Sequence, residues 1–106
     1  MAFALGGNLL DFLVLAILRY GDMYGYVLTQ HAKGVVNISD STLYPVLRRL
    51  QKEGLLFTYD QPYQGRNRRY YSITQAGLLR LDAYIAEWSS YKNQIDLILS
   101  GGMRSE

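Results

Sequence analysis

Basic side chains gather in the middle of this 106-residue chain, in an arrangement that favours contact with an anionic partner. Residues 42–72 hold six arginines and lysines against two acidic residues, a local charge of +4. The rest of the chain holds five basic and seven acidic residues, a local charge of −2. Such an asymmetry points to a polyanion such as a nucleic acid. A solvated basic face would carry the same charges. The choice between these two interpretations depends on which secondary-structure elements position the basic side chains.

The side chains that catalysis needs are scarce by comparison. There is no cysteine, which excludes disulfides, thiolate metal sites and a cysteine nucleophile. His31 is the only histidine, and no phosphate-binding loop, nucleophile elbow or metal-ligand spacing accompanies it. The sequence therefore predicts that the protein is not an enzyme and that it has no catalytic residue, metal or cofactor.

The basic segment begins with a predicted helix. The run Ser-Asp-Ser-Thr at 39–42 holds residue types that cap helix N-termini. Pro45 is tolerated in a first turn, which places the start near Ser41, and Gly54 is expected to end the helix. Its apolar side chains recur at i, i+3, i+4 and i+7 and form one stripe, made of Leu43, Val46, Leu47 and Leu50.

Two further helices are expected before this one. The first runs from about residue 8 to residue 20 and is apolar over nearly its whole circumference, so it must be buried on more than one side. The second fits residues 24–33, with Gly34 as its C-terminal cap. A short extended link at 35–38 separates the second helix from the third, as a helix-turn-helix requires.

A β-hairpin is expected after the third helix. Residues 55–60 form its first strand and residues 68–73 its return strand, which is rich in β-favouring tyrosine. The polar segment 61–67 is the predicted turn. Arginines lie near the tip of this hairpin, and a basic hairpin directly after a helix-turn-helix is typical of the wing in winged-helix proteins.

Thr74 is predicted to cap a last helix that runs to about residue 99, roughly 37 Å at 1.5 Å per residue. Its apolar residues recur at mixed three- and four-residue spacing, as in a coiled coil. The helix is longer than the rest of the domain can cover, so a second copy of the chain is expected to pack on it. The residues assigned to this homodimer seam are Leu81, Ile85, Trp88, Ile95 and Ile98.

These elements predict a mainly α fold with a small β-hairpin, a winged helix-turn-helix with a long C-terminal dimerisation helix. Residues 1–74 form the winged unit with its N-terminal helix, residues 75–100 the dimerisation helix and residues 101–106 a flexible tail. The apolar run 1–18 is interrupted by Asp11 and is too short to span a bilayer. It also lacks a basic leader and is followed directly by Arg19, so its flanks are not those of a signal peptide. We therefore expect a cytoplasmic protein without a membrane partner.

This fold predicts how double-stranded DNA would bind. Ser41, Thr42 and Tyr44 lie near the start of the third helix, whose exposed face would enter a major groove. Arg48 or Arg49 would reach phosphates. The wing arginines would follow the backbone or enter a minor groove and release counterions; they are Arg66, Arg68 and Arg69. A winged helix kept for protein partners is the alternative, but such a module does not need three wing arginines together.

Three segments resemble the signature of PadR-type transcriptional regulators. They are S-T-L-Y-P-V-L-R-R-L-Q-K-E-G-L at 41–55, R-R-Y-Y-S-I-T at 68–74 with Gly77 after it, and Gly21-Asp22 with Tyr24-Gly25-Tyr26. The resemblance spans about residues 10–99, and the single short C-terminal helix is similar to the smaller PadR subfamily. It implies a winged helix-turn-helix homodimer, joined through its last helix, that represses transcription until a ligand or another signal releases it.

The same subfamily includes a multidrug-binding repressor, which the chain resembles around Glu87-Trp88-Ser89. This resemblance implies that Trp88 stacks on a flat aromatic ligand in a pore between two subunits, with Phe12 and Asp11 lining the same space. Lys92 departs from that pattern, since it adds a positive charge one turn after Trp88. Phe12 is bulky enough to fill the pore. Trp88 is accordingly either a ligand platform or an anchor of the dimer core.

Overall fold

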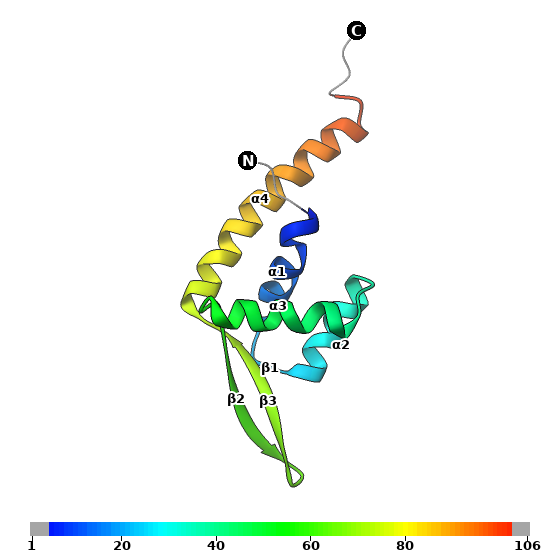
Figure 1. Cartoon of the computed structure of the whole chain (residues 1–106). Coiled ribbons are helices and arrows are strands. Elements are labelled where there is room, and N and C mark those ends of the chain that lie inside the picture. The colour runs from blue at the N-terminus through cyan, green and yellow to red at the C-terminus, as the bar shows by residue number, and fades with distance from the viewer. Residues whose placement is uncertain (1–4, 103–106) are drawn as a thin grey trace.

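The computed structural model describes residues 5–102, with side chains from residue 8 onward. Along the described chain the elements are α1 (Leu5–Leu18), β1 (Met23–Tyr24), α2 (Gly25–Val35), α3 (Asp40–Lys52), β2 (Leu56–Tyr63), β3 (Arg66–Ile73) and α4 (Gln75–Leu99). α1, α2 and α3 lie in the middle, the β2–β3 hairpin projects at one end and α4 extends past the other (Figure 1). The predicted mainly α winged helix with a long last helix is therefore confirmed.

A leucine-rich core holds α1, α2, α3 and the first half of α4 together. Each helix places its apolar stripe inward, as the spacing of leucines in α3 predicts. Burial of these side chains is the main stabilising contribution to such a small domain. The core consists of Val14, Leu15, Leu18, Leu28, Ala32, Leu43, Leu47, Leu50, Leu55, Leu56, Tyr71, Leu81 and Tyr84.

α3 begins one residue earlier than the sequence indicates. Ser39 is its N-cap and its side chain accepts a hydrogen bond from the backbone N–H of Thr42 at 3.3 Å. Pro45 consequently lies in the second turn and cannot donate to the carbonyl of Ser41. Ser41 is an exposed residue, and water can satisfy a helix carbonyl that lacks an intrahelical donor.

The bounds of the two preceding helices also differ from the prediction. α1 ends at Leu18 instead of residue 20. α2 continues through Gly34 to Val35, and the backbone N–H of Val36 donates to Ala32 at 3.0 Å. Gly34 does not end the helix because its backbone does not adopt the left-handed conformation that a terminating glycine supplies.

The hairpin is longer and its turn tighter than expected. β2 and β3 pair antiparallel from Leu56 opposite Ile73 out to Tyr63 opposite Arg66. Only Gln64 and Gly65 remain in the turn, and both have positive φ angles, 51° and 79°. Two such residues make the turn that best matches the twist of a hairpin. The predicted seven-residue turn was wrong because cross-strand pairing continues through residues that have little β-propensity of their own.

A third, very short strand was not predicted. β1 pairs with β3, with Met23 opposite Tyr71 and Tyr24 opposite Tyr70, so the sheet order is β1-β3-β2. Two residues are too few to give an alternating pattern in a sequence. This strand fixes the start of α2, which follows it directly, beside the base of the wing.

α4 is seated on the base of the wing. Thr74 caps it by accepting from the backbone N–H of Gly77 at 3.0 Å and donates its own hydroxyl to the carbonyl of Gly54 at 2.7 Å. A Cβ atom on Gly77 would lie 2.3 Å from the carbonyl oxygen of Leu55, so only glycine allows this approach. None of the helices in residues 5–102 combines the length and the apolar character that crossing a membrane requires.

Candidate nucleic-acid interface

The start of α3 presents a cluster of small hydroxyl side chains. Ser39 Oγ lies 2.9 Å from Ser41 Oγ and 3.2 Å from Thr42 Oγ1. All three residues are exposed, and Tyr44 follows one turn later with 38% of its surface exposed. The predicted base-contacting residues Ser41, Thr42 and Tyr44 thus share the open end of α3. Hydroxyl groups that donate and accept suit contacts with base edges.

A hollow of about 470 Å³ separates α3 from the wing. Arg48 enters it from α3 and Arg69 from β3, and no carboxylate is among its lining residues. The uncapped N-terminus of α2 opens into the same space, since Tyr24 gives no side-chain cap and Gly25 is the first helical residue. The full lining is Tyr24, Gly25, Tyr26, Tyr44, Arg48, Gln51, Arg69 and Tyr71.

This hollow has the chemistry of an anion site. Two guanidinium groups and a helix N-terminus all favour negative charge at the same place. Burial raises the pKa of the Tyr71 phenol, and the charge of Arg69 opposes that rise. Arg69 is shared with the exposed carboxylate of Asp60, whose Oδ1 lies 3.7 Å from its Nε. Such an exposed pair is weak and easily exchanged for a phosphate.

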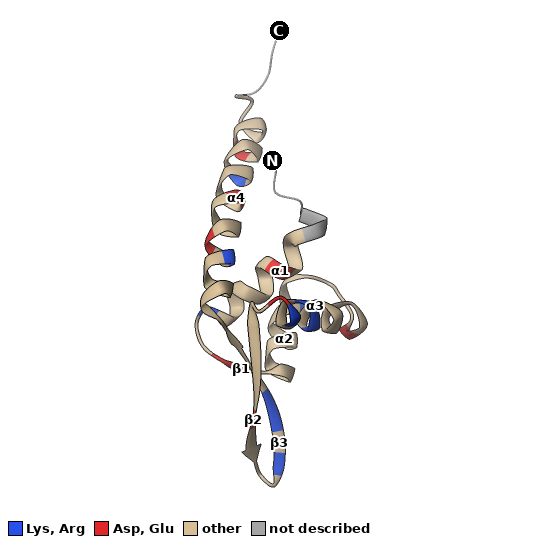
Figure 2. Cartoon of the chain, turned by 60° about the vertical axis from the view of Figure 1, so that its left-hand side comes forward, with Lys and Arg blue, Asp and Glu red and all other residues tan. Residues whose placement is uncertain are grey.

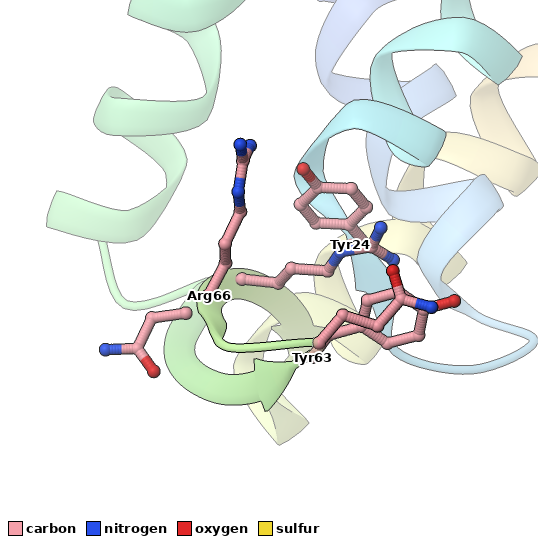
Figure 3. Close-up of a pocket in the computed structure, with 6 residues that line it drawn as sticks. Tyr24, Tyr63 and Arg66 are labelled. Carbon is pink, nitrogen blue, oxygen red and sulfur yellow. The ribbon is translucent and has the colours of Figure 1, made fainter.

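The wing carries a second hollow, of about 390 Å³, near its tip (Figure 3). The guanidinium carbon of Arg68 lies 3.7 Å from the ring centre of Tyr63 and 4.4 Å from that of Tyr24. Arg66 lines the same hollow. The half-buried Arg68 is thus held between two aromatic rings at the rim of this hollow. Figure 2 shows basic residues gathered on β3 and α3.

Tyrosines stiffen the wing below its tip. Tyr59 and Tyr70 stack across the strands at 5.6 Å between ring centres and 12° between ring planes. The hydroxyl of Tyr59 donates to Asp22 Oδ2 at 2.6 Å, and this hydrogen bond raises the pKa of Tyr59. An isolated two-stranded ribbon is marginally stable, so these contacts help to fix its direction. Tyr24, Tyr59 and Tyr63 were not among the predicted site residues, although their β-favouring type was a usable signal.

Arg49 occupies a different place from Arg48. Its Nη2 lies 2.5 Å from Oδ1 of Asp11 on α1, and its Nη1 lies 3.4 Å from Oε2 of Glu53. The hydrogen bond to Asp11 raises the pKa of Arg49. The two residues that the sequence analysis assigned to a ligand pore and to phosphate contact are therefore partners of each other. Asp11 is only 4% exposed and turns toward α3.

An aromatic cluster lies where α1 packs on α4. The ring centre of Phe12 is 6.3 Å from that of Trp88 and 6.2 Å from that of Tyr84. Tyr91 extends the cluster at 6.5 Å from Trp88. Trp88 is half-buried within its own chain and packs against the core. Phe12 and Trp88, which the resemblance places around one ligand space, thus lie side by side.

The residues assigned to the dimer seam divide into two groups along α4. Leu81 is 1% exposed and belongs to the core of its own chain, so a partner cannot reach it. Ile85 and Trp88 are partly buried against that core. Ile95 and Ile98 are 37% and 58% exposed on the half of α4 that extends past the domain. The predicted seam can therefore begin only after Leu81.

The chain matches the model of the family described as transcriptional regulator PadR-like over residues 14–83. It is 34% identical to an uncharacterised protein of Lysinibacillus sphaericus over 97 residues, which cover 87% of this chain and 89% of that one. The crystal structure of smu.1704 from Streptococcus mutans UA159 is 42% identical, with a TM-score of 0.87, and the match covers 100% of both chains.

A more distant match comes from the crystal structure of Bacillus subtilis PadR in complex with operator DNA. The TM-score is 0.66 at 24% identity, over 73% of this chain and 46% of that one, which is a likeness of fold. The family match spans most of the winged unit and the base of α4, and the family is one of regulators and not of enzymes, as the sequence predicted. The chain is a member of the PadR-like family of transcriptional regulators.

Proposed function

We propose that this chain is a sequence-specific repressor that binds double-stranded DNA as a homodimer. The observation that carries the proposal is the hollow between α3 and β3, which Arg48 and Arg69 both line and whose lining contains no carboxylate. A phosphate of the DNA backbone fits this chemistry, with the N-terminus of α2 as a third donor. The complex of B. subtilis PadR with operator DNA supports the choice of partner.

In this proposal α3 is the recognition helix. Its open N-terminal end enters a major groove, where Ser41, Thr42 and Tyr44 meet base edges. The wing arginines Arg66 and Arg68 contact the adjacent backbone or minor groove. Arg49 is left out of the phosphate contacts because its guanidinium is engaged by Asp11 and Glu53.

The homodimer is proposed on the apolar surface of α4. Ile95 and Ile98 are one turn apart and exposed, beyond the part of α4 that packs on the core. A second copy of the same helix would cover them and would place two recognition helices on one face. Two-fold symmetric binding of this kind needs half-sites about 34 Å apart, one turn of the DNA.

The test of DNA binding is a selection from a pool of random duplexes, followed by fluorescence anisotropy at several salt concentrations. The wild-type protein is expected to enrich one duplex family and to bind it with an affinity that falls steeply as salt rises. Arg48→Gln should lower that affinity and reduce the slope of log affinity against log salt by about 1.8, because the dimer loses one phosphate contact in each subunit. Lys92→Gln, which removes the same charge from α4, should change neither quantity.

Failure to enrich any duplex would count against the proposal and would favour a winged helix that binds a protein partner. A salt slope that falls equally in Arg48→Gln and Lys92→Gln would also contradict it, since net charge alone would then account for binding. These two results separate a built phosphate site from a generally basic surface.

Release by a ligand is the second part of the proposal, and the aromatic cluster supports it. Trp88 is the only tryptophan, and Phe12 and Tyr91 surround it with ring faces and edges suited to a flat aromatic molecule. Trp88→Ala is expected to weaken binding of an acridine dye, measured by dye anisotropy, while the protein still binds its duplex, because Trp88 lies on α4 and outside the α3 and wing residues proposed to contact DNA. Equal loss of both, or loss of the dimer, would instead make Trp88 an anchor of the dimer core.

A further inference from the structure

One buried carboxylate contacts both α3 and α4. Asp11 Oδ1 lies 2.5 Å from Nη2 of Arg49, and the Asp11 side chain is only 5% exposed. The other carboxylate oxygen lies 3.5 Å from the hydroxyl of Tyr84 on α4, which donates to it. Asp11 itself belongs to α1, so three helices meet at one charged group.

Each end of this contact adjoins one of the two surfaces described above. Phe12 follows Asp11 directly, and its ring packs against Trp88 and against Tyr84, the residue that also reaches the carboxylate. On α3, Arg49 follows Arg48, which lines the hollow beside the wing. The aromatic cluster and the hollow are thus each one residue away from the same ion pair.

The physical character of the pair makes it suited to transmit movement. A guanidinium–carboxylate contact is directional, and the Asp11 side of this one is shielded from water although the Arg49 side chain is 45% exposed. Separating its partners would leave the charge of Asp11 buried without compensation, which is strongly unfavourable. A displacement of α1 against α4 is therefore passed to α3, because the pair moves more readily as a unit than it opens.

We propose that the Asp11–Arg49 ion pair couples the aromatic cluster between α1 and α4 to the recognition helix. Occupation or rearrangement of the cluster around Trp88 then changes DNA affinity through the position of α3, and Arg49 is a positioning residue. This inference rests on the proposed function, since it requires that α3 binds DNA. Coupling of this kind is reciprocal, so DNA must also affect the surroundings of Trp88.

The reciprocal effect gives a test that needs no identified ligand. Trp88 is the only tryptophan, so its emission reports on the aromatic cluster. The duplex obtained by selection should change this emission when it saturates the wild-type protein. The variant Asp11→Asn with Arg49→Gln keeps hydrogen-bonding groups of similar size without either charge. It should still bind the duplex at higher concentration, but the emission change should be lost.

A matched control uses an ion pair confined to α4. Lys92 Nζ lies 3.1 Å from Asp96 Oδ2, and both side chains are exposed. Asp96→Asn removes a carboxylate from an ion pair without touching α3, so the emission change on adding the duplex should remain. A second readout is the effect of Phe12→Leu on duplex affinity. It should be roughly 2- to 30-fold in the wild-type background and absent in the double variant.

Two results would overturn the coupling. One is an unchanged Trp88 emission in wild-type protein that binds its duplex; the other is an emission change that persists in the double variant. If circular dichroism finds the double variant unfolded, Asp11→Asn alone replaces it, and a full emission change there would equally overturn the proposal. If no duplex is enriched at all, the proposed function fails instead and removes the basis of the coupling.

Discussion

Arg48 and Arg49 are adjacent arginines on α3 with different surroundings. Arg48 faces the hollow beside the wing, whereas Arg49 turns about 100° further round the helix and meets Asp11 and Glu53. A sequence shows that both are basic and that neither lies on the apolar stripe. It does not show that a carboxylate 38 residues earlier reaches one of them, because that contact depends on how α1 crosses α3.

A similar limit applies to the wing arginines. The sequence identifies Arg68 as a basic residue of the wing, but the two rings that hold it come from β1 and from β2. Tyr24 is 44 residues away along the chain and lies beside Arg68 because β1 pairs with β3. Only the three-dimensional register of the sheet brings the rings onto the guanidinium.

Replacement of Arg68 by lysine tests this ring contact at the scale of one residue. Lysine keeps the charge but loses the planar group that stacks between Tyr24 and Tyr63. Duplex affinity should fall about two- to fivefold, the equivalent of roughly 0.5–1 kcal/mol for an exposed cation–π contact, with an unchanged salt slope. Arg66→Lys is the matched control, because Arg66 lines the same hollow without a cation–π contact among the described residues. Equal losses in the two variants would rule out the ring contact.

At the scale of elements, helices were predicted better than the sheet. The caps at Ser39 and Thr74 and the leucine stripe of α3 are local signals that depend on neighbours in sequence. The strands depend on partners instead. Gln61, Pro62 and Asn67 have little β-propensity, yet they pair because the tyrosines below them and the tight turn above them hold both strands in register.

Two glycines in open space allow a test of backbone conformation without steric interference. No atom lies within 4 Å of the Cβ position of either Gly34 or Gly65, but Gly65 has a φ of +79° and Gly34 is helical. Gly34→Ala should raise the free energy of unfolding by about 0.5–1 kcal/mol. Gly65→Ala should lower it by about 1 kcal/mol, with faster amide exchange in the wing. Urea unfolding measures both, and changes of the same sign would show that φ at Gly65 is not decisive.

At the scale of the whole molecule, the sequence identified an apolar surface that one chain cannot cover. The residues of α4 that remain exposed include Ile95 and Ile98, in agreement with the expected length mismatch between α4 and the domain. Leu81 was assigned to the same surface because its spacing fits, yet it is buried in the core of its own chain. The spacing of apolar residues along a helix shows which face is buried. It does not show where along α4 the contact with its own core ends and the contact with a second copy begins.

Addition of charge to this surface tests the proposed homodimer. Ile95→Asp with Ile98→Asp should convert a dimer into a monomer in light scattering at micromolar concentration, because two carboxylates cannot be buried in an apolar seam. Asn93→Asp adds a carboxylate on the opposite side of α4 and should leave the dimer intact. A wild-type protein that is already monomeric would contradict the assignment of this surface to a second copy.

The seat of α4 on the wing gives the molecule the properties of a lever. Gly77 and Thr74 hold the base of α4 against Leu55 and Gly54, at the point where the wing begins. A small rotation of α4 about its base would move Leu99 by a large distance. Conversely, a large movement of Leu99 would shift the wing only slightly. The length of α4 consequently sets how far its apolar end lies from the wing. Insertion of seven residues, about two turns, would lengthen the arm and keep its apolar face, whereas insertion of two would turn that face away.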